Sequence, residues 1–253
     1  MTMLRLAGPG HRVATLLVIL LAVAIVVSAC GDDGKVEIED PAPEVQPGDE
    51  IPAFDPRDYV CTVEDIPAAF PYELMESGET SHEDAAALSP NPEARLDGYG
   101  EWGRVTGQRS AFSSEALAET PEQIAYFECA LDRYQEEPGA RRAFDATADS
   151  IQVLSALVLG GQGYGGFEYE EIPAPRIGDE TEALSGVAVR GEQIFEWYAV
   201  VFRRLNMVGY SITAAPQEFS FVEDAANISA LMVTLMDQEI EARLEEQSET
   251  GED

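Results

Sequence analysis

The sequence has very little histidine, lysine and cysteine. Its 253 residues include two histidines (His11 and His82), three cysteines and a single lysine, Lys35. So few histidines exclude most histidine-based catalysis and most zinc sites, because imidazole is the commonest general base and a principal zinc ligand. No two cysteines stand at C-x-x-C spacing, so a thioredoxin-type redox role has no support.

Positive charge is scarce as well. The chain has 48 Asp and Glu residues against 15 Lys and Arg, which gives a formal net charge of −33. A field of that sign repels nucleic-acid phosphates, so nucleic-acid binding is excluded. The total charged fraction of 25% and the hydrophobic fraction of 45% are those of an ordinary globular protein. Acidity with little lysine also fits a protein adapted to a salty medium.

The first 29 residues have the composition of an export signal. They contain Arg5, His11 and Arg12 but no acid, and residues 13–29 are apolar apart from Thr15 and Ser28. A basic head, an apolar stretch and small residues in that order are typical of a secretory signal. The apolar run is also just long enough for an uncleaved anchor helix.

The end of this run, Val27-Ser28-Ala29-Cys30, resembles the bacterial lipobox. The resemblance implies that Cys30 is lipidated, that residues 1–29 are removed, and that the protein is a lipoprotein anchored in the cell membrane through lipid on Cys30. Ordinary secretion and an uncleaved anchor remain alternatives. All three interpretations place the body of the protein on the extracytoplasmic side.

The remaining chain divides by composition into three parts. Residues 30–58 are rich in acids and proline and poor in large apolar side chains, which predicts an extended tether. Residues 59–246 carry the apolar periodicity of a single domain. Residues 247–253 are acidic and predict a disordered tail.

If Cys30 is lipidated, two cysteines remain, Cys61 and Cys129. An even number in an oxidising compartment suggests a disulfide, which would contribute about 4 kcal/mol for a loop of this length. Two buried thiols are the alternative, because Cys129 stands among apolar residues.

The first half of the domain mixes helices and strands. A capping box at Thr80/Glu83 or Ser81/Asp84 predicts a short helix over residues 85–88. The segment 124–134 fits a strand or a helix, and we favour a strand. Further elements are expected as strands at 70–74 and 98–110 and a helix at 140–159.

The second half is clearer. Alternating apolar residues predict strands at 167–172, 184–190, 195–203 and 208–214. Asn206 suits a positive φ in the hairpin that joins the last two. Ser220 and Glu223 form a capping box before a helix whose apolar stripe should dock on the sheet, namely Ile228, Met232, Met236, Ile240 and Leu244.

This element order predicts the α+β class, with an antiparallel β-sheet packed by two main helices. From Phe70 to about Glu246 the order and size are similar to the PsbP-like fold. The resemblance implies an arrangement only, and it assigns no functional residue.

A glycine-rich segment, Gly161 to Gly166, matches G-x-G-x-x-G. The dinucleotide fingerprint needs a strand before it and a helix after it, whereas a helix is expected before this segment and a strand after it. A mobile loop with an aromatic lip for a small ligand or peptide is a second hypothesis, and ordinary strand aromatics are the simpler one. The candidate ligand-loop residues are Gly161, Gly163, Tyr164, Gly166, Phe167 and Tyr169.

The remaining chemical candidates are weak. His82 falls in the first turn of an expected helix, where a solvated side chain is the simpler interpretation. Carboxylate pairs such as Glu168, Glu170 and Glu171, or Asp179, Glu180 and Glu182, arise from composition alone in so acidic a chain. No EF-hand pattern supports calcium, and we expect neither a metal nor a cofactor.

Three functions are compatible with these features. The leading hypothesis is a non-catalytic, membrane-anchored lipoprotein that binds a protein partner or small-molecule ligand. An exported carboxylate-dependent hydrolase is the second, since glycoside hydrolysis needs only two acids in a cleft. A structural surface protein with acidity that serves solubility is the third.

Overall fold

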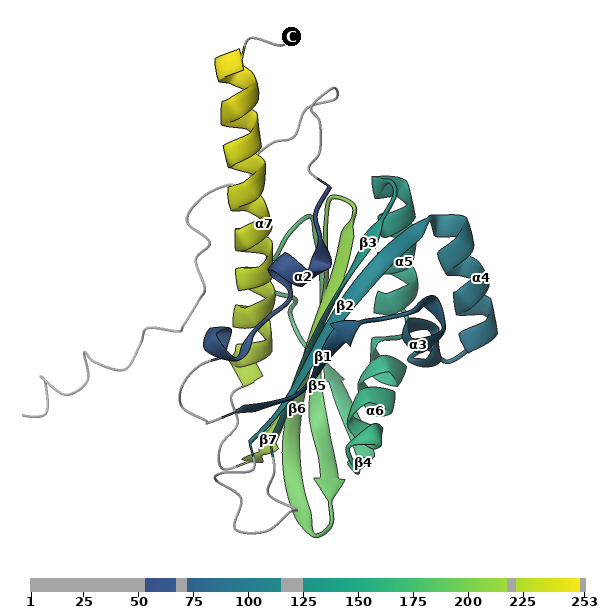
Figure 1. Ribbon diagram of the computed structural model, residues 1–253. Coiled ribbons are helices and arrows are strands. Elements are labelled where there is room, and N and C mark those ends of the chain that lie inside the picture. Colours follow the sequence, from purple (N-terminus) through teal and green to yellow (C-terminus); the bar gives the residue numbers. More distant parts are fainter. Residues whose placement is uncertain (1–52, 67–71, 115–124, 218–221, 251–253) are drawn as a thin grey trace, which may run out of the picture. The chain divides into compact units, whose positions relative to one another are not determined.

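The computed structural model describes residues 53–66, 72–114, 125–217 and 222–250 (Figure 1). All of them belong to the compact unit Asp40–Asp253. The export signal, Cys30 and most of the expected tether lie outside the described residues. Among the helices of the described ranges, none has both the length and the apolar character needed to cross a membrane.

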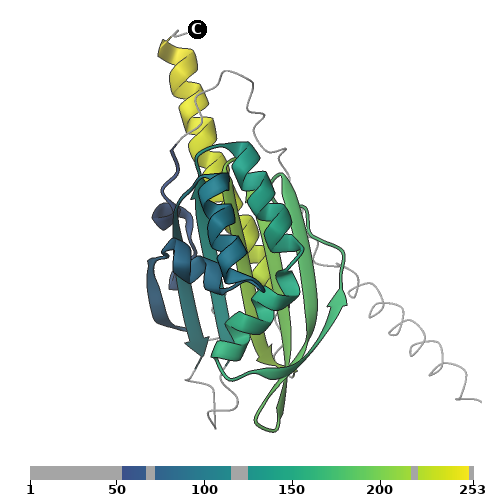
Figure 2. The same cartoon turned by 90° about the vertical axis from the view of Figure 1, so that its right-hand side faces the viewer.

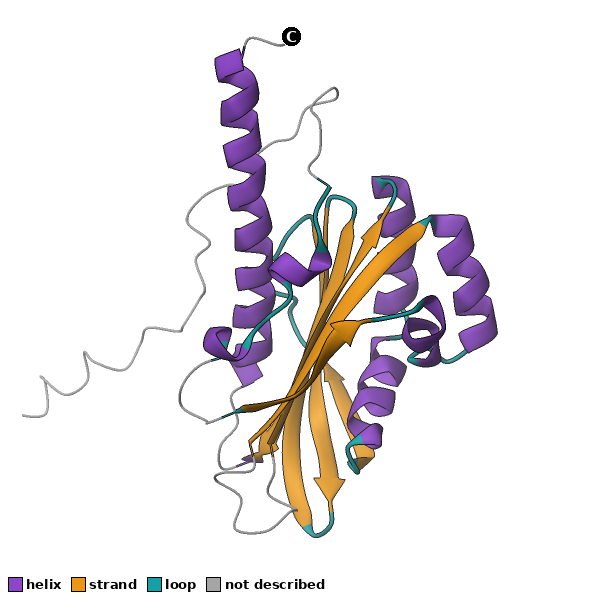
Figure 3. Ribbon diagram, in the orientation of Figure 1, coloured by secondary structure: helices purple, strands orange, loops and turns teal. Residues whose placement is uncertain are grey.

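Seven strands form one antiparallel sheet, so the predicted α+β class is confirmed (Figure 3). Their order across the sheet is β1-β2-β3-β7-β6-β5-β4. The strands are β1 (Glu73–Glu79), β2 (Arg104–Ser114), β3 (Ala125–Tyr134), β4 (Gly165–Glu171), β5 (Glu180–Arg190), β6 (Gln193–Arg204) and β7 (Met207–Pro216).

Helices cover both faces of this sheet. On one face lies α7 (Val222–Thr250), together with the short α2 (Pro56–Tyr59) and the 3₁₀ turn η1 (Val63–Asp65). The opposite face carries four helices, which Figure 2 shows in front of the strands. They are α3 (His82–Ala87), α4 (Pro92–Trp102), α5 (Glu137–Ala148) and α6 (Ile151–Gly161). The "two main helices" expected from the sequence therefore understate the cover on this second face.

Two apolar clusters fill the space on either side of the sheet. Beneath α7 the cluster includes Phe112, Phe127 and Phe202, and beneath α3–α6 it includes Phe144, Phe195 and Trp197. Strand β6 contributes alternate residues to both clusters, which is why its sequence is apolar at nearly every position. Strand β6 is therefore an interior strand that is covered on both faces.

The predicted stripe on the last helix is confirmed. Ile228, Met232, Met236 and Ile240 are each at most 2% exposed and face the sheet, and Leu244 packs at the edge of the same cluster. Recurrence every four residues keeps these side chains on one side of α7. Ser220, which was expected to cap this helix, lies outside the described residues.

The four strands predicted in the second half are confirmed, but the hairpin between β6 and β7 differs in detail. The positive φ falls on Leu205 (51°), not on Asn206. Asn206 instead uses its side-chain amide to donate to the carbonyl of Tyr134 at 2.8 Å. The backbone amide of Leu205 donates to Asp179 at 2.7 Å, and this bond helps to hold the unusual conformation.

The first half contains more helix than the sequence predicted. The strand expected at 98–110 is wrong in its first part, because α4 continues to Trp102 and β2 begins after Gly103, which has φ 72°. The single helix expected at 140–159 is two helices, interrupted at Asp149 and Ser150. The strand favoured at 124–134 is confirmed as β3. Ser81, not Thr80, caps α3 by accepting from the amide of Asp84 at 3.0 Å.

The expected ends of the domain also need correction. The strand expected at 70–74 lies later, as the exposed edge strand β1. Phe54 and Pro56, assigned to the tether from composition, are buried, and the Phe54 ring contacts that of Tyr59 at 5.3 Å between centroids. At the other end, α7 continues to Thr250 and so runs into the expected tail.

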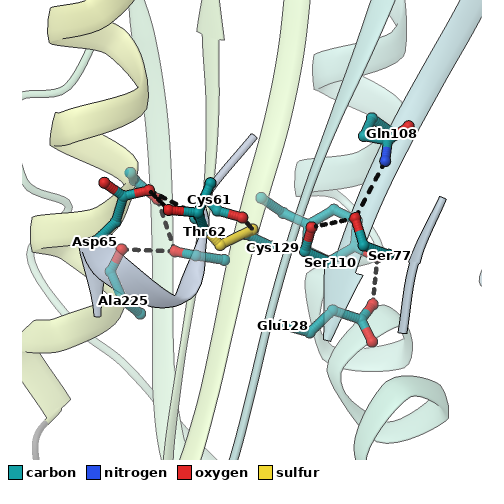
Figure 4. Close-up of a disulfide and its surroundings, with 12 residues drawn as sticks. Cys61, Thr62, Asp65, Ser77, Gln108, Ser110, Glu128, Cys129 and Ala225 are labelled. Carbon is teal, nitrogen blue, oxygen red and sulfur yellow. Dashed lines mark hydrogen bonds between the residues drawn. A yellow bond between two sulfur atoms is a disulfide. The ribbon is translucent and has the colours of Figure 1, made fainter. Parts of the chain in front are cut away.

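Cys61 and Cys129 form a disulfide that fixes this N-terminal segment to β3 (Figure 4). Their Cα atoms are 6.3 Å apart, and the two residues are 2% and 0% exposed. Successive residues of a strand point to opposite faces, so Cys129 faces α7 whereas Glu128 faces the four-helix side. The bridge therefore belongs to the α7 layer.

Candidate functional site

A cavity of about 400 Å³ lies between the sheet and the four helices on its second face. Residues of β1, β2, β3 and β7 and of α3–α6 line it, and we call it the helix-face cavity. Its size falls within the range of small-molecule binding sites, roughly 300–1,000 Å³. Its wall is mixed, with apolar side chains such as Leu88 and Leu154 beside charged ones.

Small residues in the sheet create the hollow. The strand register places Gly78, Arg109, Ala130 and Tyr210 in one row across β1, β2, β3 and β7. A Cβ atom added at Gly78 would meet nothing within 4 Å. Along this row, positions with almost no side chain (Gly78 and Ala130) alternate with long polar side chains (Arg109 and Tyr210).

The connection between α3 and α4 contributes the most unusual group. Helix α3 ends at Ala87, and Asn91 opens α4 by accepting from the amide of Ala94 at 3.2 Å. Ser89 lies in this short connection, lines the cavity and is 7% exposed. Its hydroxyl oxygen is buried and has no hydrogen-bond partner among the residues that the structure describes. A buried hydroxyl of this kind costs free energy unless something bonds to it.

The arginines on the wall are already bonded to the protein. Arg95 of α4 donates to the Thr147 hydroxyl at 2.9 Å, to the Ala146 carbonyl at 2.6 Å and to the Ser150 hydroxyl at 3.2 Å. Arg109 of β2 pairs with Glu76 of β1 at 2.8 Å, where the Glu76 side chain is 68% exposed. The Glu76–Arg109 pair thus lies at the solvent end of the cavity.

Asp132 of β3 is held by an arginine behind the wall. The Arg104 side chain is fully buried and donates to Asp132 at 2.7 Å and to the Thr80 hydroxyl at 2.8 Å. Its guanidinium lies 5.1 Å from the centroid of the Tyr99 ring, which gives a cation–π contact. Burial raises the pKa of Tyr99 to about 12, so its hydroxyl is neutral at physiological pH.

A buried carboxylate lies next to the cavity but not on its wall. Glu128 is 2% exposed and accepts hydrogen bonds from the hydroxyls of Tyr210, at 2.6 Å, and of Tyr126. Burial raises the pKa of Glu128, and the two tyrosine hydroxyls oppose that rise in part. Tyr210 lines the cavity, whereas Glu128 is not among the lining residues.

The carboxylates proposed from composition do not form a catalytic pair. Glu168, Glu170 and Glu171 are exposed on the edge strand β4, and Glu182 is exposed on β5. Asp179 and Glu180 pair with two buried arginines: Arg203 lies 3.1 Å from Asp179 and 2.5 Å from Glu180, and Arg204 lies 2.8 Å from Asp179. These acids have structural roles at one end of the sheet.

The candidate ligand loop is not part of the cavity. Helix α6 ends at Gly161 and β4 begins at Gly165, so the predicted order of helix before strand is confirmed and the dinucleotide geometry is absent there. Gly163 and Gly166 have positive φ values of 86° and 62°. Tyr164 is 4% exposed and packs edge-on against Phe195 at 4.9 Å, whereas Tyr169 is 56% exposed. Phe167 is partly buried against the same cluster as Tyr164.

His82 is the first residue of α3, as the capping pattern predicted. Its ring lies 6.0 Å from that of Tyr99 between centroids. Within the ranges that the structure describes, no group of three or more His, Cys, Asp or Glu side chains is placed to hold a metal ion.

The described residues form an α+β domain with a ligand-sized cavity of mixed polarity. No family model matches the sequence, and no curated protein matches it. Among solved structures, the chain is similar to the extracellular domain of PknH from Mycobacterium tuberculosis, with 11% identity and a TM-score of 0.42. The alignment covers 71% of this chain and 98% of that domain.

Two further solved structures are similar to this chain. LpqN of Mycobacterium tuberculosis, a protein involved in cell envelope biogenesis, has 11% identity and a TM-score of 0.33, over 65% of this chain and 78% of that one. An uncharacterised protein of Mycobacterium smegmatis has 16% identity and a TM-score of 0.34, over 66% and 89%. Similarities at this level assign no function to the chain.

Proposed function

We propose that this chain is an exported, lipid-anchored protein whose α+β domain binds a small polar molecule in the helix-face cavity. The observation that carries the binding function is the cavity of about 400 Å³, which lies between the sheet and helices α3–α6. The mixed wall suits a ligand with both polar groups and an apolar part.

The anchoring part of the proposal is supported by the sequence. Val27-Ser28-Ala29-Cys30 closes an apolar run, and the acidic, proline-rich segment that follows would hold the domain off the anionic membrane surface. Metabolic labelling with a fatty-acid analogue and intact-mass analysis test this directly. We expect lipid on an N-terminal Cys30 and none in the Cys30→Ser variant. An unmodified N-terminus in the wild type contradicts the anchor.

The binding part is tested by filling the cavity. Gly78→Phe places a ring where the structure has open space, so the strand should tolerate it. Gly165→Phe is the matched control, because a side chain there also meets nothing within 4 Å and the residue lies on β4, away from the cavity. A library of small polar metabolites is screened by thermal shift against all three proteins.

A ligand at 100 times its Kd stabilises the folded state by about 2.7 kcal/mol. We expect at least one compound to raise the Tm of the wild type and of Gly165→Phe but not of Gly78→Phe. Equal shifts in all three proteins would show that binding occurs outside the cavity and would contradict the proposed site.

A further inference from the structure

One carboxylate on the wall of the helix-face cavity is fixed by a buried arginine. Asp132 of β3 lines the cavity, and 20% of its side chain is exposed. Its Oδ1 atom accepts from Nη2 of Arg104, whose side chain is fully buried, at 2.7 Å. Its other oxygen, Oδ2, has no hydrogen-bond partner among the described residues and, unlike the Ser89 hydroxyl, is not buried. Asp132 therefore presents a fixed acceptor that a molecule in the cavity can reach.

A hydroxyl lies directly beside this acceptor. The same Nη2 atom of Arg104 donates to Oγ1 of Thr80 at 2.8 Å, so Thr80 and Asp132 share one donor. Thr80 also lines the cavity. Its hydroxyl is the acceptor in that contact, and the described part of the chain supplies no acceptor for its proton. Thr80 and Asp132 together offer one free donor beside one free acceptor.

Gly107 makes this arrangement possible. The strand register places Gly107 of β2 opposite Asp132. A Cβ atom there would lie 2.0 Å from Oδ1 of Asp132, 2.3 Å from Nη2 of Arg104 and 2.6 Å from Oγ1 of Thr80. The three groups therefore meet directly above a residue that has no side chain.

The charge balance of this group disfavours an ion as ligand. Arg104 pairs with Asp132 and offsets its charge, so a cation would meet little net negative charge at this point. An anion would lie against the carboxylate, and the two guanidiniums on the wall, Arg95 and Arg109, already have acceptors in the protein. A neutral hydroxyl can both donate to Asp132 and accept from Thr80, which neither an ammonium nor a carboxylate can do.

The surface next to this group is apolar. Asp132 is opposite Val208 of β7, and the next residue of β3 on the same face is Ala130. Leu88 and Leu154 line the cavity from the side of the helices. A ring with hydroxyls at its edge and C–H groups on its faces would use both kinds of surface.

On the basis of the proposed function, we propose that the ligand is a neutral polyhydroxylated ring, a monosaccharide or a cyclic polyol. Adjacent hydroxyls of the ring donate to Oδ2 of Asp132 and accept from the Thr80 hydroxyl, and the ring lies over Ala130 and Val208. A carboxylate acceptor forms the stronger, charge-assisted kind of hydrogen bond with a hydroxyl. Asp132 and Thr80 thus select for hydroxyl groups.

Saturation-transfer NMR on the full-length chain tests this assignment with probes of three charge types. The neutral probes are D-glucose, D-mannose, D-galactose, D-arabinose and myo-inositol. Putrescine is the cationic probe and succinate the anionic one. We expect at least one neutral probe to bind and neither ion to bind. Gly78→Phe, which fills the cavity, should abolish the signal of the neutral probe.

Variants at Thr80 test the contact itself. Thr80→Val keeps the shape of the side chain and removes the hydroxyl, so it should weaken the neutral probe about tenfold. Thr80→Ser keeps the hydroxyl and should stay within about threefold of the wild type. Thr106→Val is the matched control, because Thr106 lies on the opposite face of the sheet and bonds to Glu79 at 2.9 Å. It should change the affinity by less than about twofold.

Asp132→Asn should weaken the neutral probe at least about tenfold, because it replaces the charged acceptor. This variant leaves the buried Arg104 without its charge partner, so its thermal unfolding is measured first. If it does not fold, the comparison of Thr80→Val with Thr80→Ser and Thr106→Val decides alone. Equal weakening by Thr80→Val and Thr106→Val, or binding that survives Gly78→Phe, would overturn the proposal.

Failure of this proposal is distinguishable from failure of the proposed function. Binding of putrescine or succinate alone, lost in Gly78→Phe, would overturn the hydroxylated ligand while the cavity stands as a binding site. The same conclusion follows if no probe binds and the metabolite screen finds only compounds of another class that Gly78→Phe blocks. If the screen finds no compound that Gly78→Phe blocks and no probe binds, both proposals fail.

Discussion

The disulfide between Cys61 and Cys129 gives a quantitative test of how the N-terminal segment is held to the sheet. The two cysteines are 68 residues apart in sequence. In the chain-entropy model, closing a loop of this length stabilises the folded state by about 4 kcal/mol, because the cross-link restricts the unfolded chain. Both side chains are buried in the α7 layer, but substitution by alanine removes only one sulfur atom from each, so it adds only a small loss of packing.

We expect the double variant Cys61→Ala/Cys129→Ala to lose about 4 kcal/mol of unfolding free energy. Urea unfolding followed by tryptophan fluorescence measures this, with Cys30→Ser in both proteins so that the third thiol takes no part. The single variant Cys61→Ala should lose nearly as much, since it breaks the same bond. Reductant should destabilise the parent and leave the double variant unchanged. A loss below about 1 kcal/mol would refute the reasoning.

Three further predictions concern the sheet and its helices. Burial raises the pKa of Glu128, so the native state keeps a proton that the unfolded chain releases near pH 4.3, and stability falls as pH rises through the native pKa. In that window the unfolding free energy of Glu128→Gln should therefore rise relative to that of the wild type by up to about 1.4 kcal/mol per pH unit, which urea unfolding from pH 4 to 8 measures. A difference in unfolding free energy that does not change with pH contradicts this. Asp179→Ala should lower the unfolding free energy by about 3 kcal/mol, because Arg203 and Arg204 are 2% and 3% exposed and lose a shared partner. The control Glu182→Ala, at an exposed position, should change it by no more than about 0.5 kcal/mol. Gly139→Ala should lower the Tm strongly, because its Cβ would lie 1.9 Å from the Trp102 carbonyl oxygen. Gly100→Ala has open space on α4 and should stabilise the folded state by about 0.5–1 kcal/mol. Equal effects of the two substitutions on the Tm would be inconsistent with this packing.

The elements predicted well from sequence are those that bury a regular face. Strand β6 contributes to both apolar clusters and α7 buries one residue in every four, so periodicity alone reveals both. Helix α4 has no such signal. It contains Gly98 and Gly100, and its buried residues include the polar Arg95. The edge strand β1 is exposed at every position and so has no apolar alternation to detect.

The break between α5 and α6 was missed for a different reason. No proline or glycine marks it. Ser150 instead donates its hydroxyl to the Ala146 carbonyl at 2.7 Å, so a local side-chain bond accompanies the interruption. The left-handed conformation of Leu205 was missed because Asn206 is the better residue for a positive φ. Contacts made by Asp179 and Tyr134, far away in sequence, decide the turn.

The cavity could not be found from motifs, because its residues come from four strands and four helices. It depends on register, which places Gly78 and Ala130 in one row with Arg109 and Tyr210. One sequence signal did point toward it. In strand β3, Glu128 and Asp132 stand on the same face as Tyr126 and Ala130, and acids at inward positions of a strand indicate polar groups inside the domain.

The scarcity of positive charge has a consequence that composition alone does not show. Arg95, Arg104, Arg203 and Arg204 are each at most 9% exposed. Because these cations are inside the domain and bonded there, they do little to neutralise the surface, which is more acidic than the ratio of 15 bases to 48 acids suggests. An exposed carboxylate on such a surface is surrounded by water and gains little from pairing with a cation.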